Sequence, residues 1–318
     1  MSRFLGIDTS CYTTSAAVYD SSRGLIGEER IVLSVNNGSR GLSQSNMVFQ
    51  HTRNLPVILK RLSPLLTQLE AAGVSSFPRR RADSYMPAFL VGKGTAESLT
   101  AALHIPLYEF SHQENHALAA IRNYPDLWGR PFYMIHMSGG TQDVLSCSWS
   151  GDFMEISLLI KSKDITAGQF IDRIGVSLGL HFPCGRDLEK LAQSADSSYF
   201  IPCSSVKGSF SFSGPETRVQ RDILKGIYRS EDIARGVLAH IGNALEKELT
   251  GFPFEPGRPF IAVGGVMSNA YIRHRFMDIC QKLNLLPCFA DIAYSSDNAT
   301  GNAFGAFMRY SHENIQCQ

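Results

Sequence analysis

Two histidines four residues apart are the clearest candidates for chemistry in this chain. The stretch SHQENH carries His112 and His116, and the residues that follow predict a helix with Ser111 as its N-cap. On a helix, positions i and i+4 lie on one face, so two imidazoles at this spacing can bind one metal ion. Such pairs also occur on ordinary surface helices, and spacing cannot locate the third ligand that a metal needs. The motif alone leaves both interpretations open.

A metalloprotease is a further interpretation, and the residues between the histidines argue against it. Zinc proteases of this kind place a glutamate general base directly after the first histidine, in the pattern HExxH. Here residue 113 is Gln, and Glu114 comes one position later. At that position the carboxylate is expected on another face of the helix. The sequence therefore disfavours peptide hydrolysis.

Three polar turns that follow predicted strands are typical of nucleotide binding. They are GIDTSCYTT (6–14), which contains Asp8, MSGGT (137–141) and VGGVMSN (263–269). Glycine allows the backbone to approach a ligand closely, and a helix N-terminus offers free N–H groups to an anion. Glycine pairs also occur in turns that bind nothing. The presence of all three at equivalent strand ends favours a nucleotide.

The composition describes a globular protein without a strong charge preference. The chain has 318 residues, 44% of them hydrophobic and 19% charged, with a net charge of +1. This excludes a disordered chain and gives no overall attraction to nucleic acid; 79–81 is a local run of three arginines. Seven cysteines without a CxxC pair predict reduced thiols. The N-terminus does not resemble a signal peptide, and no apolar run suits a membrane span. We therefore expect a cytoplasmic protein without a membrane partner.

The pattern of predicted elements repeats once along the chain. Three strands are expected at 4–8, 15–19 and 25–35, and three more at 131–137, 143–149 and 153–160. The repeat predicts an α/β protein with two similar lobes around a cleft. Between the trios we expect a helix over 46–72, with breaks or kinks at Pro56 and Pro64, a loop over 73–86, a helix over 88–103 and a strand over 107–110. The expected domains are 1–105 with 295–318, and 106–294.

The second half contains further helices and a few isolated polar candidates. Helices are expected at 166–179, 186–194, 216–227, 231–249, 269–283 and 297–310, with strands at 259–263 and 287–290. Asp172, Arg173 and Glu189 are candidate polar contacts, and Gly185 opens a predicted helix. Asp297 precedes the last helix, where the residues alone favour an N-cap acid over a metal ligand.

Over nearly its whole length the sequence resembles the TsaD/Gcp family, the catalytic subunits of tRNA threonylcarbamoyladenosine synthase, formerly described as O-sialoglycoprotein endopeptidases. The resemblance rests on motifs that follow one another in the family order. They are GIDTSC, HQENH, MSGG, DITAGQFIDRIGVSLGL, FPCG, SFSFSG, VGGVMSN and SDNATGNA. Together these motifs are specific.

The resemblance implies a fold, an activity and a set of site residues. The fold is the actin/Hsp70-like (ASKHA) α/β fold, with two lobes around a nucleotide cleft. The implied acyltransferase moves a threonylcarbamoyl group from threonylcarbamoyl-AMP to N6 of adenosine 37 of tRNA. One iron or zinc ion would be bound by His112, His116 and Asp297. Substrate contacts would fall on His136, Met137, Ser138, Gly139, Gly140, Asp172, Gly185 and Asn269, and the partners would be tRNA and proteins of the threonylcarbamoylation machinery.

Four departures from the family pattern support an alternative. SCYTT replaces SCDET, so Tyr12 and Thr13 stand in place of two acids, and the family histidine between Gly140 and Thr141 is missing. AGQFID carries Gln169 in place of Glu, and SYMPAFLVG replaces a glycine-rich segment. The alternative is a catalytically degenerate paralogue that binds metal and nucleotide and acts as a partner or regulator of the true synthase. The apolar helix predicted over 46–72 is a candidate partner surface.

Overall fold

The chain folds into two compact units. The computed structural model describes residues 2–10, 12–34, 42–81, 84–151, 153–197, 199–202, 208–291, 294 and 297–316. Unit 1 comprises Met1–Arg130, Trp149–Glu155 and Ala293–Gln318, and unit 2 comprises Pro131–Ser148 and Ile156–Ile292. The first division therefore comes after Arg130, later than the expected boundary between 105 and 106, because the strand and helix that follow residue 106 pack with unit 1.

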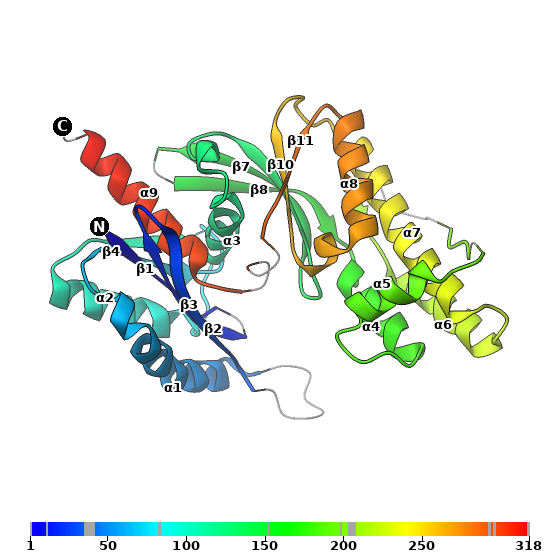
Figure 1. Ribbon diagram of the computed structural model, residues 1–318, viewed down its shortest axis with the longest axis horizontal. Helices are drawn as coiled ribbons and strands as arrows, with labels where there is room; N and C mark the ends of the chain where they lie inside the picture. Colours follow the sequence, from blue (N-terminus) through cyan, green and yellow to red (C-terminus); the bar gives the residue numbers. More distant parts are fainter. Residues whose placement is uncertain are drawn as a thin grey trace. The chain divides into compact units, whose positions relative to one another are not determined.

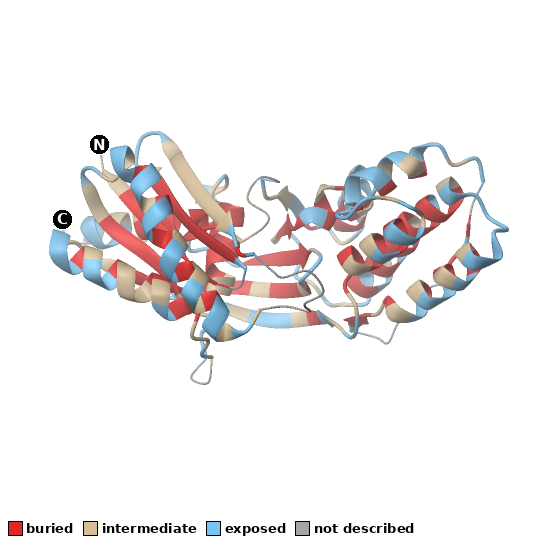
Figure 2. Ribbon diagram, turned by 90° about the horizontal axis from the view of Figure 1, so that it is seen from below, coloured by how far each residue is buried: buried red, intermediate tan, exposed pale blue. Residues whose placement is uncertain are grey.

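Unit 1 is built on a five-stranded mixed sheet (Figure 1). Three strands form the predicted antiparallel meander, and two more lie parallel to the first of them. The strands are β1 (Arg3–Asp8), β2 (Thr13–Asp20), β3 (Gly24–Val32), β4 (Leu69–Phe77) and β5 (Leu107–Ser111), in the order β3-β2-β1-β4-β5. The central strand β1 is buried over most of its length, as Figure 2 shows in red for the middle of this sheet.

Helices cover both faces of this sheet. They are α1 (Gln44–Leu62), α2 (Phe89–Leu103), α3 (His112–Ile121) and α9 (Thr300–Gln316). Leu5 and Ile7 of β1 pack in one cluster with apolar residues of α1 and α2. Gly6 points to the other face, where a Cβ would collide with the backbone of Ala299 and Ala303 at the start of α9. The glycine thus allows α9 to lie close against the sheet.

The expectation of a helix over 46–72 and a loop over 73–86 is partly wrong. The helix α1 continues through Pro56 and ends at Leu62, where a 3-10 turn at Ser63–Leu65 contains Pro64. The next segment is β4, which pairs with β1 and β5 and is buried in its middle. Small residues in LEAAGVSSF gave a weak strand signal, but the sheet satisfies their backbone groups on both sides.

Unit 2 repeats the strand order of unit 1. Its strands are β6 (Phe132–Met137), β7 (Gln142–Ser150), β8 (Phe153–Ser162), β9 (Ser209–Phe210), β10 (Pro259–Val263) and β11 (Leu286–Phe289). The sheet order is β11-β10-β6-β7-β8-β9, and β10 runs parallel to β6 as β4 does to β1. The series β8-β7-β6-β10-β11 therefore matches β3-β2-β1-β4-β5. This confirms the repeat of two similar α/β lobes predicted from the sequence.

In the described part of unit 2, five helices surround one large apolar core. They are α4 (Ala167–Ser177), α5 (Gly185–Gln193), α6 (Ser213–Lys225), α7 (Ser230–Thr250) and α8 (Ala270–Lys282). Short 3-10 turns lie at Pro125–Leu127 in unit 1 and Gly265–Ser268 in unit 2. Among the described residues, no helix combines the length and apolar character needed to cross a bilayer.

Candidate metal centre and nucleotide site

The start of α3 presents both histidines of HQENH, one turn apart. Ser111 is the N-cap, as predicted: its Oγ accepts from Glu114 N–H at 3.1 Å, and a Glu114 carboxylate oxygen accepts from Ser111 N–H at 2.6 Å. Glu114 also forms an ion pair with Arg80 at 3.1 Å. The glutamate is therefore occupied in capping the helix, which agrees with the sequence argument against a protease.

His112, His116 and Asp297 lie together within unit 1. The two Nε2 atoms are 3.0 Å apart, and Asp297 Oδ1 is 3.5 Å from His112 Nε2 and 3.3 Å from His116 Nε2. Ligands around a tetrahedral zinc ion, at bond lengths of about 2.0–2.1 Å, are separated by roughly 3.4 Å. The three donor atoms thus have the mutual spacing that one metal ion requires.

The position of Asp297 corrects the expectation that it serves as an N-cap. The helix α9 begins at Thr300, and Asn298 Oδ1 accepts from Thr300 N–H at 2.9 Å. Asn298, rather than Asp297, therefore satisfies the N–H of the first helical residue. Asp297 is left to direct its carboxylate toward the two histidines.

Asp8 and Ser10, at the end of β1, determine how His112 is protonated. His112 Nδ1 lies 3.2 Å from Asp8 Oδ2 and 2.8 Å from Ser10 Oγ. Ser10 donates to Asp8 through both its N–H and its hydroxyl, each at 2.9 Å. These acceptors favour a proton on Nδ1, which leaves the Nε2 lone pair available for a metal.

The charge balance of this centre favours a bound cation. Burial alone would lower the pKa of His112, but the carboxylates of Asp8 and Asp297 outweigh it and raise that pKa well above its usual value. Burial likewise opposes ionisation of Asp297, yet bonds to His112 and His116 hold its pKa well below the usual range. Two imidazoles and a carboxylate suit zinc or iron(II). The residues therefore fit the metal that the family resemblance implies.

The role of Asp8 was missed at the sequence level. The stretch 6–14 suggested a nucleotide turn, whereas the described part of it turns Asp8 and Ser10 toward His112. An acid at the end of the first buried strand was the available signal, but no sequence spacing connects it to α3. Of the departing residues nearby, Tyr12 is 41% exposed and Thr13 is buried in the β2–β3 ladder; Cys11 lies outside the described residues.

The glycine turns of unit 2 meet at the carboxyl ends of two parallel strands. His136 and Met137 end β6 and are buried, followed by the turn of Ser138, Gly139 and Gly140. Ser138 N–H donates to Thr141 O at 2.8 Å, so the turn closes without the family histidine. Gly264, at the end of β10, has a φ of +104°, and a Cβ there would overlap the backbone of Met137.

Helix N-termini surround these turns. Thr166 caps α4 and donates to Gly139 O at 3.1 Å. In α4, Asp172 accepts from Cys184 N–H at 2.8 Å, directly before Gly185 opens α5 as predicted. Glu189 of α5 accepts from Ala270 N–H at 2.7 Å, and Asn269 caps α8. The residues that the resemblance implies for substrate contacts in unit 2 thus belong to one connected set of turns and helix starts, an arrangement suited to an anion.

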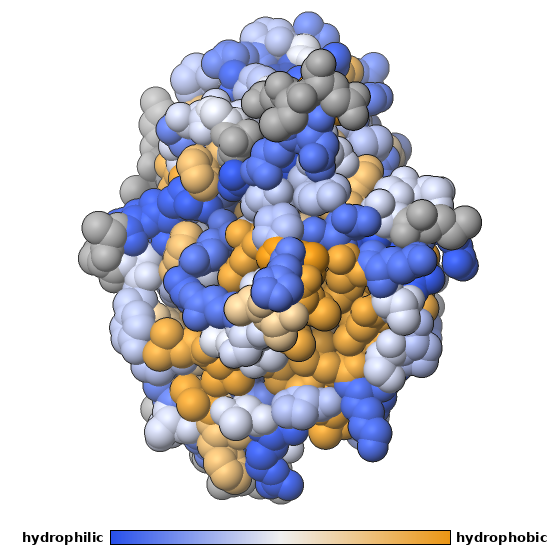
Figure 3. Space-filling model, turned by 90° about the vertical axis from the view of Figure 1, so that its left-hand side faces the viewer, coloured by the Kyte–Doolittle hydropathy of each residue, from blue (hydrophilic) through white to orange (hydrophobic). Residues whose placement is uncertain are grey.

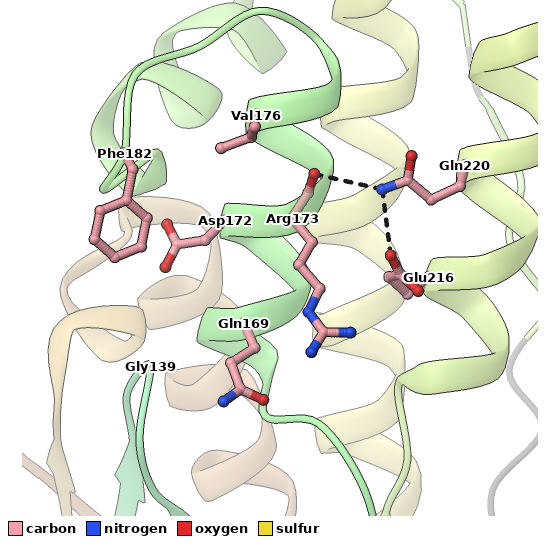
Figure 4. Close-up of a pocket in the computed structure, with 8 residues that line it drawn as sticks. All are labelled: Gly139, Gln169, Asp172, Arg173, Val176, Phe182, Glu216 and Gln220. Atoms are coloured by element: carbon pink, nitrogen blue, oxygen red, sulfur yellow. Dashed lines mark hydrogen bonds between the residues drawn. The ribbon is translucent and has the colours of Figure 1, made fainter. Parts of the chain in front are cut away.

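A pocket of about 610 Å³ opens beside this set (Figure 4). It is lined by Gly139, Gln169, Asp172, Arg173, Val176, Phe182, Glu216 and Gln220. In Figure 4, Phe182 and Asp172 lie at one end, and Gln220 donates to Arg173 O and to Glu216 at the other. Burial raises the pKa of Asp172, and the N–H of Cys184 partly offsets this effect. Phe182, Glu216 and Gln220 carried no recognisable signal in the sequence.

Gln169 has a structural explanation as a departure from the family pattern. Its side chain accepts from Thr166 N–H at 3.3 Å, while its own N–H donates to Thr166 Oγ1 at 3.1 Å. This is a capping box, in which glutamine serves as well as glutamate. The change from Glu to Gln therefore leaves the start of α4 intact.

Comparison with known proteins agrees with the motifs. The family model for TsaD, tRNA N6-adenosine threonylcarbamoyltransferase, matches residues 85–304. The protein of that name from Sulfurihydrogenibium sp. (strain YO3AOP1) is 29% identical over 98% of this chain and 91% of its own length. That from Thermosipho melanesiensis is 29% identical over 96% of this chain and 94% of its own.

Solved structures with similar folds include proteins of other activities. Component A of the (R)-2-hydroxyglutaryl-CoA dehydratase from Acidaminococcus fermentans matches 98% of this chain and 100% of its own, with a TM-score of 0.57 and 16% identity. A ROK family glucokinase from Streptomyces griseus matches 96% of this chain and 98% of its own, with a TM-score of 0.51 and 11% identity. At these identities the likeness shows the fold alone, and it is the actin/Hsp70-like α/β fold expected from the sequence.

Proposed function

The chain belongs to the TsaD family of tRNA N6-adenosine threonylcarbamoyltransferases, and we propose that it transfers a threonylcarbamoyl group from threonylcarbamoyl-AMP to N6 of adenosine 37 of tRNA. The observation that carries this proposal is the cluster of His112, His116 and Asp297. Its three donor atoms are 3.0–3.5 Å apart. His112 and His116 come from one turn of α3, and Asp297 precedes α9, so two elements far apart in the chain build one centre.

The proposed metal is a single iron or zinc ion. His112 and His116 supply neutral imidazole nitrogens, and Asp297 supplies a carboxylate oxygen. When bound, such an ion provides a Lewis acid that polarises a carbonyl oxygen. Asp8 and Ser10 keep the proton of His112 on Nδ1, away from the metal side.

In unit 2 we propose that the adenylate is held by His136, Met137, Ser138, Gly139, Gly140, Asp172, Gly185 and Asn269. The turn of Ser138, Gly139 and Gly140 and the start of α5 offer N–H groups to phosphate oxygens. Asp172, at the edge of the pocket, is placed to accept hydrogen bonds from ribose hydroxyls. The adenosine amine is a weak nucleophile, so the main task of the protein is to place it against the carbamoyl carbon.

The same proposal includes the binding partners of the protein and the compartment in which it acts. The acceptor is tRNA, and the reaction takes place in the cytoplasm with other proteins of the threonylcarbamoylation machinery or a homologous synthase. The helix α1 exposes Phe49 at 58% and Val57 at 44%, and α2 exposes Leu90 and Leu103 at about half. Figure 3 shows apolar surface on the side of the molecule where these helices lie. We propose that a protein partner contacts α1 and α2 there.

A catalytically degenerate paralogue is the second candidate, favoured by one observation. Tyr12 and Thr13 stand where the family pattern has two acids, and Thr13 is built into the β2–β3 ladder. Such a protein would keep metal and nucleotide and would act as a partner or regulator of a true synthase.

A transfer assay distinguishes the two candidates. The purified protein, loaded with zinc or iron(II), is mixed with fresh threonylcarbamoyl-AMP and unmodified ANN-reading tRNA, with and without partner proteins of the machinery. The tRNA is digested, and its nucleosides are identified by mass spectrometry. The proposal expects modified adenosine from the wild type and a loss of at least about 100-fold in His112→Ala. If an established family enzyme is active beside an inactive wild type, the paralogue is supported instead.

A further inference from the structure

We propose that Asn115 is the positioning residue that holds the three metal-binding side chains in one arrangement. It belongs to α3, between the two histidines. It lies between three segments that carry or orient ligands: α3 itself, the end of β1, and the segment before α9. The inference rests on the metal centre of the proposed function.

The side chain of Asn115, which belongs to α3, forms hydrogen bonds to the end of β1 and to the segment that leads into α9. Its Nδ2 donates to Asp8 Oδ2 at 3.0 Å and to Asn298 O at 2.6 Å. Its Oδ1 accepts from Asn302 N–H at 2.9 Å. One amide thus binds the carboxylate that orients His112, the carbonyl one residue after Asp297, and the first turn of α9.

The surroundings make this linkage rigid. Asn115 is 1% exposed, and Asp8, Asn298 and Asn302 are 0–1% exposed. A Cβ on Gly301 would collide with the backbone carbonyl of Asn115, so α3 and α9 are in direct backbone contact at this point. A buried amide with every one of these bonds satisfied favours a single arrangement of its partners.

The hydrogen bonds of Asn115 matter more for the position of Asp297 than for the positions of the two histidines. His112 and His116 are set by the helix that carries both, whereas Asp297 belongs to neither α3 nor α9 and precedes the start of α9 at Thr300. The bond from Asn115 to Asn298 O therefore fixes the segment that carries Asp297 against the helix that carries the histidines. Loss of this bond leaves the two histidines on α3 in place and removes a direct contact between α3 and the segment that carries Asp297.

The test is a metal titration of full-length variants. Metal-free wild type and Asn115→Ala are titrated with zinc against a chromophoric chelator, and with cobalt(II) to record the d–d absorption bands. We expect zinc affinity to fall about 10- to 100-fold, as for other residues that orient metal ligands, and the cobalt bands to change in intensity. A general loss of stability would not alter the bands of the folded protein.

The matched control is Ser75→Ala. Ser75 Oγ accepts from Asn302 Nδ2 at 2.9 Å, so the control removes a buried bond to the same helix without touching a ligand segment. We expect Ser75→Ala to lower the melting temperature and to leave zinc affinity within about twofold of wild type. If Asn115→Ala does not fold, Asn115→Asp decides, since it keeps the size and the acceptor for Asn302 N–H but cannot donate to Asp8 or Asn298.

The zinc titration distinguishes failure of the positioning role of Asn115 from failure of the proposed metal centre. If the wild type binds zinc and a folded Asn115 variant binds it equally well with an unchanged cobalt spectrum, the positioning role is overturned and the metal centre stands. If the wild type binds no zinc, the metal centre of the proposed function is overturned together with the role of Asn115.

Discussion

The tautomer of His112 decides whether its Nε2 atom is available to a metal ion. Asp8 Oδ2 and Ser10 Oγ lie 3.2 and 2.8 Å from His112 Nδ1 and favour a proton there, while Nε2 faces His116 and Asp297. Carboxylate–histidine pairs of this kind raise the basicity of a ligand and fix the orientation of its ring. The site therefore needs residues that never touch the metal.

The first prediction concerns Asp8→Asn. The amide is isosteric, but an Nδ2 group in the Oδ2 position cannot accept from His112 Nδ1–H or from Asn115. We expect zinc affinity to fall about 10- to 100-fold in a competition titration. The control is Asp278→Asn, because Asp278 is 45% exposed on α8 in unit 2. Equal affinity of Asp8→Asn and wild type would show that Asp8 has no part in metal binding.

The second prediction concerns the dependence of zinc affinity on pH. The pKa of His112 in the metal-free protein is raised well above 6.5 by Asp8 and Asp297 against the effect of burial, so a proton competes with the metal at neutral pH. Because the metal requires neutral His112, affinity should rise with pH up to this raised pKa and fall on acidification. Calorimetry at pH 7 in buffers of different ionisation enthalpy should detect proton release on zinc binding. Binding without proton release would contradict the raised pKa.

At the level of elements, the close packing of α9 decides where Asp297 can lie. The start of α9 contacts β1 at Gly6 and α3 at Gly301, and in both places a side chain would overlap backbone atoms. These two contacts determine how closely α9 packs against the sheet of unit 1 and against α3. The element that follows Asp297 is thus placed by a glycine of β1 and by a glycine of its own first turn.

The third prediction compares Gly301→Ala with Gly94→Ala. The added Cβ at Gly301 meets the carbonyl of Asn115 and, at 2.7 Å, the nitrogen of Ala119, so we expect a loss of about 1–3 kcal/mol in unfolding free energy. Gly94 lies inside α2 with nothing within 4 Å of its Cβ, so alanine there should add about 0.5–1 kcal/mol. Urea denaturation measures both. Equal effects of the two changes would contradict the packing argument.

Elements with clear periodicity were predictable from the sequence, and the connections between them were less so. The two meanders, Ser111 as an N-cap, and Gly185 as the start of α5 are confirmed. The strand β4 was missed because most residues of LEAAGVSSF are small and do not alternate clearly, and its position between β1 and β5 cannot be seen locally. The residues alone favoured a cap for Asp297, and the resemblance placed it with the two histidines, because no local pattern shows that the fold brings it to α3.

For the whole molecule, the repeated strand order means that each unit supplies one equivalent strand end. The end of β1 in unit 1 carries Asp8 and Ser10, and the end of β6 in unit 2 carries Ser138 and Gly139. In unit 1 the turn serves the histidines of the metal centre. In unit 2 it serves, under the proposal, the phosphate of the adenylate. Under the proposal, the duplicated architecture therefore carries two different chemistries.

Under the proposed function, His112, His116 and Asp297 bind one metal ion. The most direct test is the metal content of the purified protein after loading with zinc and gel filtration, measured by mass spectrometry of the metal. We predict one ion per chain in wild type and in the control His274→Ala, whose side chain is 72% exposed on α8, and almost none in His112→Ala, His116→Ala or Asp297→Ala. Equal metal content in wild type and the three site variants would contradict the account.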